Sequence, residues 1–226
     1  MNSVTLHYNP AIPWHRKRRE YFERGLNEIG IECRFSTMRM RVSDDPAILF
    51  GTSAFKEIEH SPGDWLLVDR ACFLDPDYVR LGWNGRDRLA DYCLPDEPEF
   101  ERWHSLGIET GTLHEEGAAR IVLCGDYERV PEPPEGIEPT HFRPHPMPGA
   151  AMRDDLPVVH DFESACHAIV GRSTVAFEAL TQGLMVTTTD PNAMASMSPW
   201  QIAYTQWSWS EIEQGEPIRH LFHGKS

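Results

Sequence analysis

Short apolar runs that each end at a turn residue constrain this chain most. Trp65-Leu66-Leu67-Val68 precedes Asp69, and Ile121-Val122-Leu123-Cys124 precedes Gly125. Apolar runs of this length are typical of strands buried on both faces, as in parallel sheets. Helical spacing of apolar residues lies between such runs, most clearly over residues 14–29. The alternation of strands and helices predicts an α/β protein built on parallel sheets.

The predicted elements fall into two halves. In the first half we expect strands at 4–8, 31–35, 47–50 and 64–68, with helices at 14–29 and 54–60. In the second we expect strands at 120–124, 140–143, 168–170 and 185–188, with helices at 162–168 and from Ser173. Two helices at 201–209 and 210–222 follow, the second capped by Ser210. Between Asp69 and His114 the pattern predicts mostly loops.

Length and composition limit the class of protein. With 226 residues, the chain has room for one large domain or two small ones. It contains no apolar run of 18 residues, so we expect no membrane span. Its five cysteines stand singly without a CxxC pair, which favours reduced thiols and a cytoplasmic location.

The charge pattern bears on partners. A net charge of −14 disfavours nonspecific binding to nucleic acid. A local basic patch nevertheless exists at His15-Arg16-Lys17-Arg18-Arg19. This patch is either a surface that follows phosphates or an ordinary solvated helix face, and the sequence leaves both open.

Two motifs in the second half suit an anionic ligand. Arg143 and His145 stand in a loop stiffened by prolines, within Thr140-His141-Phe142-Arg143-Pro144-His145-Pro146. Farther along, Gly171-Arg172-Ser173-Thr174 opens a predicted helix. Backbone N–H groups, hydroxyls and cationic side chains together suit a phosphate. Taken alone, the first motif also fits a surface histidine, and the second fits a simple helix cap.

These two motifs, over residues 119–192, resemble the His-Pro and Ser/Thr motifs of nucleotide-sugar-dependent glycosyltransferases with the GT-B fold. The resemblance is to bacterial sialyl- and Kdo-type enzymes and to short phage-encoded relatives. It implies two small Rossmann-like domains facing a cleft, 1–116 for the acceptor and 117–200 for the donor. It also implies that the helices of 201–226 pack back toward the first domain. The chain is shorter than typical GT-B enzymes, which leaves open whether a full acceptor domain is present.

The donor site follows from the motifs and the resemblance. The predicted donor-binding residues are Gly125, Arg143, His145, Gly171, Arg172, Ser173, Thr174 and Glu178. Among them, the resemblance assigns Glu178 to a donor hydroxyl. The expected donor is a UDP-sugar rather than a CMP-sugar, with no further cofactor. Because no clear DxD or zinc motif is present, we expect metal-independent transfer, in which Arg143 and His145 offset the leaving-group charge.

The acceptor side is less determined. Asp69 follows a buried strand and is the predicted general base, although it could equally be a turn residue paired with Arg70. His7 and Asp91 are the alternative bases. The predicted acceptor-binding residues are Asn9, Trp14, Arg16 and Arg18.

The acceptor's identity and the oligomeric state stay open in the sequence. A 5-hydroxymethylpyrimidine base in bacteriophage DNA is one candidate acceptor, which would make the chain a DNA-modification enzyme. A surface polysaccharide or lipid-linked sugar is the other. A non-catalytic module that binds nucleotide or phosphate is the alternative outside the transferases.

Overall fold

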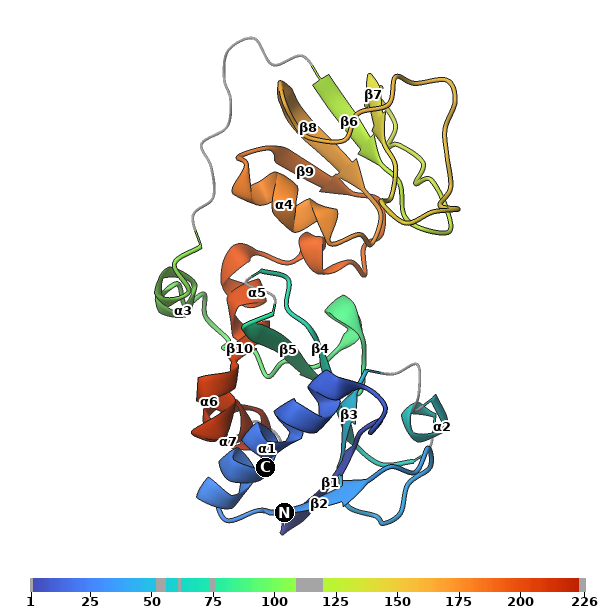
Figure 1. Cartoon of the computed structure of the whole chain (residues 1–226). Helices are drawn as coiled ribbons and strands as arrows, with labels where there is room; N and C mark the ends of the chain where they lie inside the picture. Colours follow the sequence, from blue (N-terminus) through green and yellow to red (C-terminus); the bar gives the residue numbers. More distant parts are fainter. Residues whose placement is uncertain (1, 52–55, 61, 74–75, 109–119, 224–226) are drawn as a thin grey trace. The chain divides into compact units, whose positions relative to one another are not determined.

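The computed structural model describes residues 2–51, 56–60, 62–73, 76–108 and 120–223. Its contacts divide the chain into two compact units, whose elements are labelled in Figure 1. Unit 1 comprises residues 1–102 and 200–226, and unit 2 comprises residues 103–199. The predicted domain boundary at 116/117 lies outside the described residues. Each unit is therefore described by itself.

Unit 1 is built on a six-stranded sheet in the order β10-β5-β4-β3-β1-β2. Four of its strands are parallel, namely β1 (Ser3–His7), β2 (Glu32–Ser36), β3 (Ala47–Phe50) and β4 (Trp65–Arg70). Two more are added antiparallel at one edge, β5 (Tyr78–Trp83) beside β4, and β10 (Gln206–Ser208) beside β5. The last strand comes from the C-terminal part of the chain.

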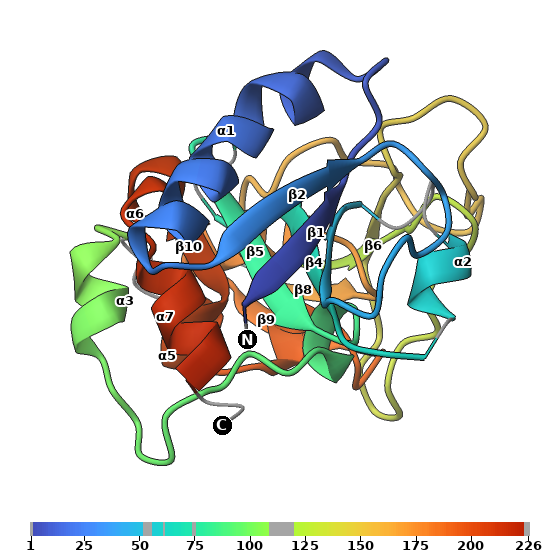
Figure 2. The same cartoon turned by 90° about the horizontal axis from the view of Figure 1, so that it is seen from below.

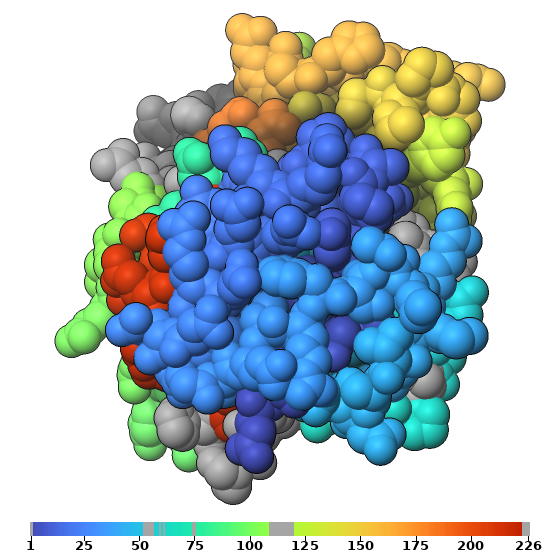
Figure 3. All heavy atoms as spheres, turned by 60° about the horizontal axis from the view of Figure 1, so that its bottom comes forward, coloured from blue at the N-terminus to red at the C-terminus, as the bar shows by residue number. Residues whose placement is uncertain are grey.

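Helices from both ends of the chain cover one face of this sheet (Figure 2). They are α1 (Pro13–Glu28), α6 (Trp209–Glu213) and α7 (Glu216–His223). In the space-filling view, blue N-terminal residues and red C-terminal residues lie side by side (Figure 3). A Cβ at Gly25 of α1 would lie 1.9 Å from the carbonyl oxygen of Ile212, so the close approach of α1 and α6 requires glycine.

The opposite face of the unit 1 sheet packs against α2 (Lys56–Glu59) through Ile58, which is fully buried against Leu49 and Leu67. The remaining short elements are a 3-10 helix, η1 (Asp87–Leu89), and two helices at the unit boundaries, α3 (Glu101–Ser105) and α5 (Pro199–Thr205).

Unit 2 has a four-stranded, wholly parallel sheet in the order β7-β6-β8-β9. Its strands are β6 (Arg120–Cys124), β7 (His141–Arg143), β8 (Ala165–Val170) and β9 (Met185–Thr188). One face packs on α4 (Val175–Thr181), and loop residues Val130, Ile137 and Leu156 pack against the other. A 3-10 helix, η2 (Met194–Ser196), follows β9. Mixed α/β architecture with parallel sheets, as predicted, is confirmed.

Several predicted elements of the C-terminal part are wrong in type. The helix expected over 201–209 is instead α5 followed by β10, because Gln206 and Trp207 pair with β5. The weakly patterned region between Asp69 and His114 contributes β5 itself. Ser208, and not Ser210, caps α6, since its hydroxyl accepts from the Glu211 N–H at 3.2 Å in a capping box.

Unit 2 also differs from the prediction locally. The helix expected over 162–168 is absent there, because Ser164 turns the chain with a φ of 58° and β8 begins at Ala165. A single bridge joins Phe142 of β7 to Val158, in a segment to which the sequence assigned no element. The helix expected from Ser173 begins two residues later, at Val175.

Candidate functional site

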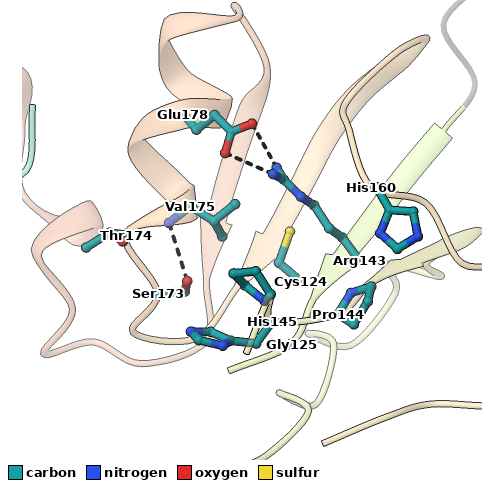
Figure 4. Close-up of a pocket in the computed structure, with 11 residues that line it drawn as sticks. Cys124, Gly125, Arg143, Pro144, His145, His160, Ser173, Thr174, Val175 and Glu178 are labelled. Atoms are coloured by element: carbon teal, nitrogen blue, oxygen red, sulfur yellow. Dashed lines mark hydrogen bonds and ion pairs between the residues drawn. The ribbon is translucent and has the colours of Figure 1, made fainter. Parts of the chain in front are cut away.

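A cavity of about 570 Å³ opens at one edge of the unit 2 sheet (Figure 4). We refer to it as the unit 2 pocket. It is lined by Cys124, Gly125, Arg143, Pro144, His145, Pro146, His160, Ser173, Thr174, Val175 and Glu178. All the predicted donor-binding residues except Gly171 and Arg172 are among them. The structure thus brings most of that set together.

Parallel pairing places these residues side by side although they are distant in sequence. β6 ends at Cys124, β7 at Arg143 and β8 at Val170, so the loops after these strands leave from one edge of the sheet. β7 and β8 lie on opposite sides of β6, so the chain crosses the sheet between them. Ligands of α/β sheets bind at such a switch point, beyond the carboxyl ends of the strands.

Arg143 and Glu178 form an ion pair at the wall of the pocket. Both terminal nitrogens of Arg143 donate to the two carboxylate oxygens of Glu178, each at 3.0 Å. The Arg143 guanidinium also lies over the Phe162 ring, 4.5 Å from its centroid. The side chain of Arg143 is mostly buried, whereas Glu178 is exposed. This bidentate pair holds the guanidinium in one orientation and engages both of its terminal nitrogens.

Two histidines line the same cavity. His145 accepts through Nδ1 from the Met147 N–H at 3.3 Å, and its ring meets the Tyr127 ring edge-on at 5.8 Å. His160 is exposed and lies near Arg143 in Figure 4. The sequence analysis missed His160. The signal was present, since His160 directly follows the segment that pairs with β7 through Val158.

Gly171 and Arg172 lie outside the pocket lining. A Cβ at Gly171 would lie 2.2 Å from Oδ2 of Asp126, so glycine is needed there for the close approach of a carboxylate of the protein itself. The same Asp126 oxygen accepts from the Arg172 N–H at 3.3 Å. The Arg172 side chain pairs with Asp190 at 3.4 Å. The part of the motif that reaches the pocket is therefore Ser173-Thr174.

Within that part the two hydroxyls differ. The Ser173 hydroxyl accepts from the Val175 N–H at 3.3 Å, while the Thr174 side chain makes no capping bond. Cys124 also lines the pocket, but burial raises the pKa of its thiol to about 12. The thiol is protonated at neutral pH, which argues against a nucleophilic role for Cys124.

Unit 1 contains a second cavity, of about 220 Å³, which we call the unit 1 pocket. Its lining consists of Trp14, Arg18, Asp69, Arg70, Pro76, Val79 and Trp209. Trp14, Arg18 and Asp69 were predicted from separate features of the sequence and are brought together here. Of the other predicted acceptor residues, Asn9 and Arg16 lie outside the lining. Trp209 was not predicted for this site.

Asp69 is held by a buried guanidinium. Its Oδ2 accepts from Arg80 at 2.7 Å, and its Oδ1 accepts from the backbone N–H of Arg70 at 2.8 Å. Arg80 reaches Asp87 with its other nitrogen at 3.1 Å. The ion-pair partner of Asp69 is thus Arg80 on β5, and not the side chain of Arg70, which the sequence suggested as an alternative.

The other two candidate bases lie outside both pockets. His7 is buried, with Nδ1 at 3.0 Å from the Met38 carbonyl oxygen, and burial lowers its pKa. Asp91 accepts from the Cys93 N–H at 2.9 Å through its side chain. Among the three candidates, only Asp69 faces a cavity.

The basic residues at the start of α1 differ in burial and in their contacts. Arg18 lies over the Trp209 ring at 4.1 Å from the centroid, and Arg19 donates to the Tyr8 hydroxyl at 2.5 Å. His15 is buried and accepts from the Asn9 N–H at 3.0 Å, and burial lowers its pKa to about 4. It is therefore neutral at pH 7. Only Arg16 and Lys17 of this run are both charged and exposed.

Among the residues that the structure describes, no group of three or more His, Cys, Asp or Glu side chains is arranged to hold a metal ion. No helix in the described part of the chain is long and apolar enough to cross a membrane.

The fold is of a Rossmann-like α/β class, with a polar pocket at the carboxyl edge of a parallel sheet. The structure is similar to that of KpsC, a beta Kdo 2,7 transferase from Thermosulfurimonas dismutans, with a TM-score of 0.50 and 12% sequence identity. The similarity covers 97% of this chain and 100% of the KpsC chain. No protein-family model and no curated protein sequence matches the chain. At this identity the likeness shows the fold alone.

Proposed function

We propose that the chain is a glycosyltransferase that moves a sugar from a nucleotide-sugar donor to a hydroxyl acceptor. The observation that carries the proposal is the convergence of Arg143, His145, His160 and Glu178 on one pocket. A guanidinium and two imidazoles can bind phosphate oxygens, while a carboxylate can accept from sugar hydroxyls. A nucleotide sugar combines phosphate oxygens with sugar hydroxyls. The overall likeness to a transferase agrees with this proposal.

The donor's leaving group determines the roles proposed for the cations. Glycosyl transfer leaves negative charge on the phosphate, and fixed donors at that position lower the barrier. Arg143 and His145 are proposed to stabilise this charge without a metal. The two phosphates of a UDP-sugar would engage both Arg143 and His145, whereas a CMP-sugar has a single phosphate. This favours a UDP-sugar as the donor. The 570 Å³ cavity falls within the range of about 300–1,000 Å³ typical of small-molecule sites.

Asp69 is the proposed general base for the acceptor hydroxyl. It is the one candidate base that lines a cavity, and the ion pair with Arg80 orients its carboxylate. A base removes the acceptor proton as the new glycosidic bond forms, and such catalysis contributes about 10²–10⁴-fold.

The test is a binding and turnover assay on the full chain. UDP-sugars and CMP-sugars are titrated by calorimetry and by thermal shift, because a ligand of the folded state raises the melting temperature. Release of free sugar or nucleotide then reports turnover. Arg143→Ala should weaken nucleotide-sugar binding at least about tenfold, since charge-assisted hydrogen bonds contribute roughly 1.5–3 kcal/mol.

Arg129→Ala is the matched control, because Arg129 is an exposed arginine of unit 2 that does not line the pocket. It should bind like the wild type. Failure of every nucleotide sugar to bind would overturn the proposal, as would equal losses in the two variants. Binding with no hydrolysis or transfer to any acceptor would instead support a nucleotide-binding module.

A further inference from the structure

The lining of the unit 1 pocket is positively charged, although the chain as a whole is acidic. The whole chain carries a net charge of −14, yet the pocket is lined by two arginines, Arg18 and Arg70, and one acid, Asp69. That acid is already paired with the buried Arg80 at 2.7 Å. The unmatched charge at the pocket is therefore positive, and an anionic ligand group would complement it.

The two arginines are suited to different tasks. Arg18 donates through one terminal nitrogen to the Pro76 carbonyl oxygen at 3.2 Å and lies over Trp209, so its position is fixed. A guanidinium has five N–H donors, so Arg18 keeps others for a ligand. Arg70 is exposed, and its side chain forms no ion pair or hydrogen bond with other described residues. Arg70 is free to pair with a ligand.

An indole provides the apolar wall. Trp14 is 43% exposed, and its buried side is held edge-on against the Phe50 ring, with centroids 5.4 Å apart. Trp209 also lines the pocket, with Nε1 donating to the same Pro76 oxygen at 3.1 Å. A fixed, partly exposed aromatic face can cover the C–H face of a sugar ring.

The size of the pocket restricts its ligand. Its 220 Å³ lies below the range of about 300 Å³ and more for drug-sized ligands, which suits a single ring. A DNA strand would also need a row of free cations along α1. Arg19 is engaged with Tyr8, and the exposed cations Arg16 and Lys17 lie outside the pocket lining, so α1 does not continue the pocket as such a row.

We propose that the unit 1 pocket binds one sugar unit that carries an anionic group, a carboxylate or a phosphate. Trp14 covers the ring, Arg70 and Arg18 bind the anion, and the carboxylate of Asp69 accepts from a ring hydroxyl. The role of this pocket as the acceptor site of a transferase rests on the proposed function. The binding of an anionic sugar is argued from the pocket alone.

The experiment titrates the full chain with three small probes. Methyl β-glucuronide and glucose 6-phosphate carry the two anions, and methyl β-glucoside is the neutral match. Saturation-transfer NMR and calorimetry should show at least tenfold tighter binding for one or both anionic sugars. Comparison of the first two probes separates a carboxylate from a phosphate preference.

Variants then assign the site. Arg70→Gln should reduce the anionic preference to threefold or less, and Trp14→Ala should weaken all three probes at least fivefold. Lys17→Gln, at an exposed cation on the same helix outside the lining, should change nothing. Since Trp14 and Arg70 are both exposed, we expect these variants to fold, and a thermal melt checks this.

Equal affinity for charged and neutral probes, or no detectable binding, would overturn the proposal. So would an unchanged preference in folded Arg70→Gln. Displacement of the glucuronide by an oligonucleotide containing 5-hydroxymethylcytosine, with a steep salt dependence, would assign the pocket to DNA instead. Arg143→Ala should retain sugar binding here, so failure of the nucleotide proposal and failure of this one can be told apart.

Discussion

The two pockets of this chain are built in different ways. The unit 2 pocket is formed by the loops that follow three neighbouring parallel strands, and a single sheet edge positions them. The unit 1 pocket combines α1, the end of β4 and α6, whose Trp209 lies 140 positions after Asp69 in numbering. One pocket follows from local sheet geometry, and the other depends on the C-terminal segment packing against the N-terminal half.

This difference has a consequence for chemistry. In unit 2 the charges of the wall are balanced within the pocket, by the pair of Arg143 with Glu178. In unit 1 the acid is balanced by Arg80, its cross-strand neighbour on β5, which does not line the pocket. Glu178 can therefore exchange partners when a ligand arrives, whereas Asp69 keeps its orientation. The first arrangement suits binding, and the second suits a fixed base.

The largest expected effect tests that contrast directly. Asp69→Asn preserves shape and removes the basic carboxylate, so sugar transfer should fall about a hundredfold or more. Nucleotide-sugar binding should stay at the wild-type level, because the donor is assigned to unit 2. Initial rates and calorimetric titration measure the two quantities.

Asp77→Asn serves as its control, since Asp77 is exposed and does not line the pocket. A near-normal rate in folded Asp69→Asn would remove Asp69 from the mechanism. A thermal melt is needed alongside, because the change leaves Arg80 with Asp87 as its remaining acidic partner.

The second prediction is that the unit 1 pocket depends on the C-terminal segment and the unit 2 pocket does not. Gly25→Ala would place a methyl group against the Ile212 carbonyl, and overpacking of this kind typically costs about 1–3 kcal/mol of unfolding free energy. Because α6 must then move, ligand binding in the unit 1 pocket should weaken. Asn27→Ala, at an exposed position of the same helix, is the control and should be near neutral.

Nucleotide binding in unit 2 should be unchanged in Gly25→Ala. A parallel loss at both pockets would show that the two units are energetically coupled, and the comparison between independent pockets would fail. Denaturant unfolding and the two titrations together decide this.

Most of the residues predicted for the donor site meet in the unit 2 pocket, and the reason is physical. Short strands that end at Cys124 and Arg143 can be recognised from local patterns. Parallel strands then bring their carboxyl ends to one edge of the sheet. The same reasoning could have included His160. It failed for Gly171, since a glycine that admits a phosphate and one that admits Asp126 look identical in sequence.

Unit 1 was less predictable because its decisive contacts are distant in sequence. The three residues of β10 carry no strand period of their own, and they become a strand only by pairing with β5. A helix was expected there, and Trp209 was not predicted for the site. Trp14, Arg18 and Asp69 could be proposed individually, but their meeting depends on how α1, β4 and α6 pack.

The third prediction separates the two hydroxyls of the unit 2 pocket. Ser173→Ala should lower stability by up to about 1 kcal/mol, because its hydroxyl accepts from the helix. Thr174→Ala should leave stability unchanged and weaken nucleotide-sugar binding about threefold to tenfold, as expected for one lost hydrogen bond. The opposite division, with Ser173→Ala weakening binding and Thr174→Ala only lowering the melting temperature, would exchange their roles.

The smallest expected effect concerns the exchange of partners at Arg143. Glu178→Gln removes the charge that now holds the guanidinium, so UDP alone should bind about twofold to threefold more tightly. The UDP-sugar should gain less or lose affinity, because the carboxylate is the proposed acceptor for a sugar hydroxyl. The quantity to measure is therefore the ratio of the two affinities, with Glu163→Gln, an exposed acid of unit 2 outside the pocket, as control.

If the affinity for the UDP-sugar falls relative to the affinity for UDP, Glu178 contacts both the sugar and Arg143. If UDP and the UDP-sugar gained equally, Glu178 would only compete with phosphate for Arg143, and the donor hydroxyl would need another acceptor. Weaker binding of UDP alone would mean that the ion pair must stay intact to orient Arg143. The exchange of partners, and with it the contrast to the fixed Asp69 of unit 1, would then be wrong.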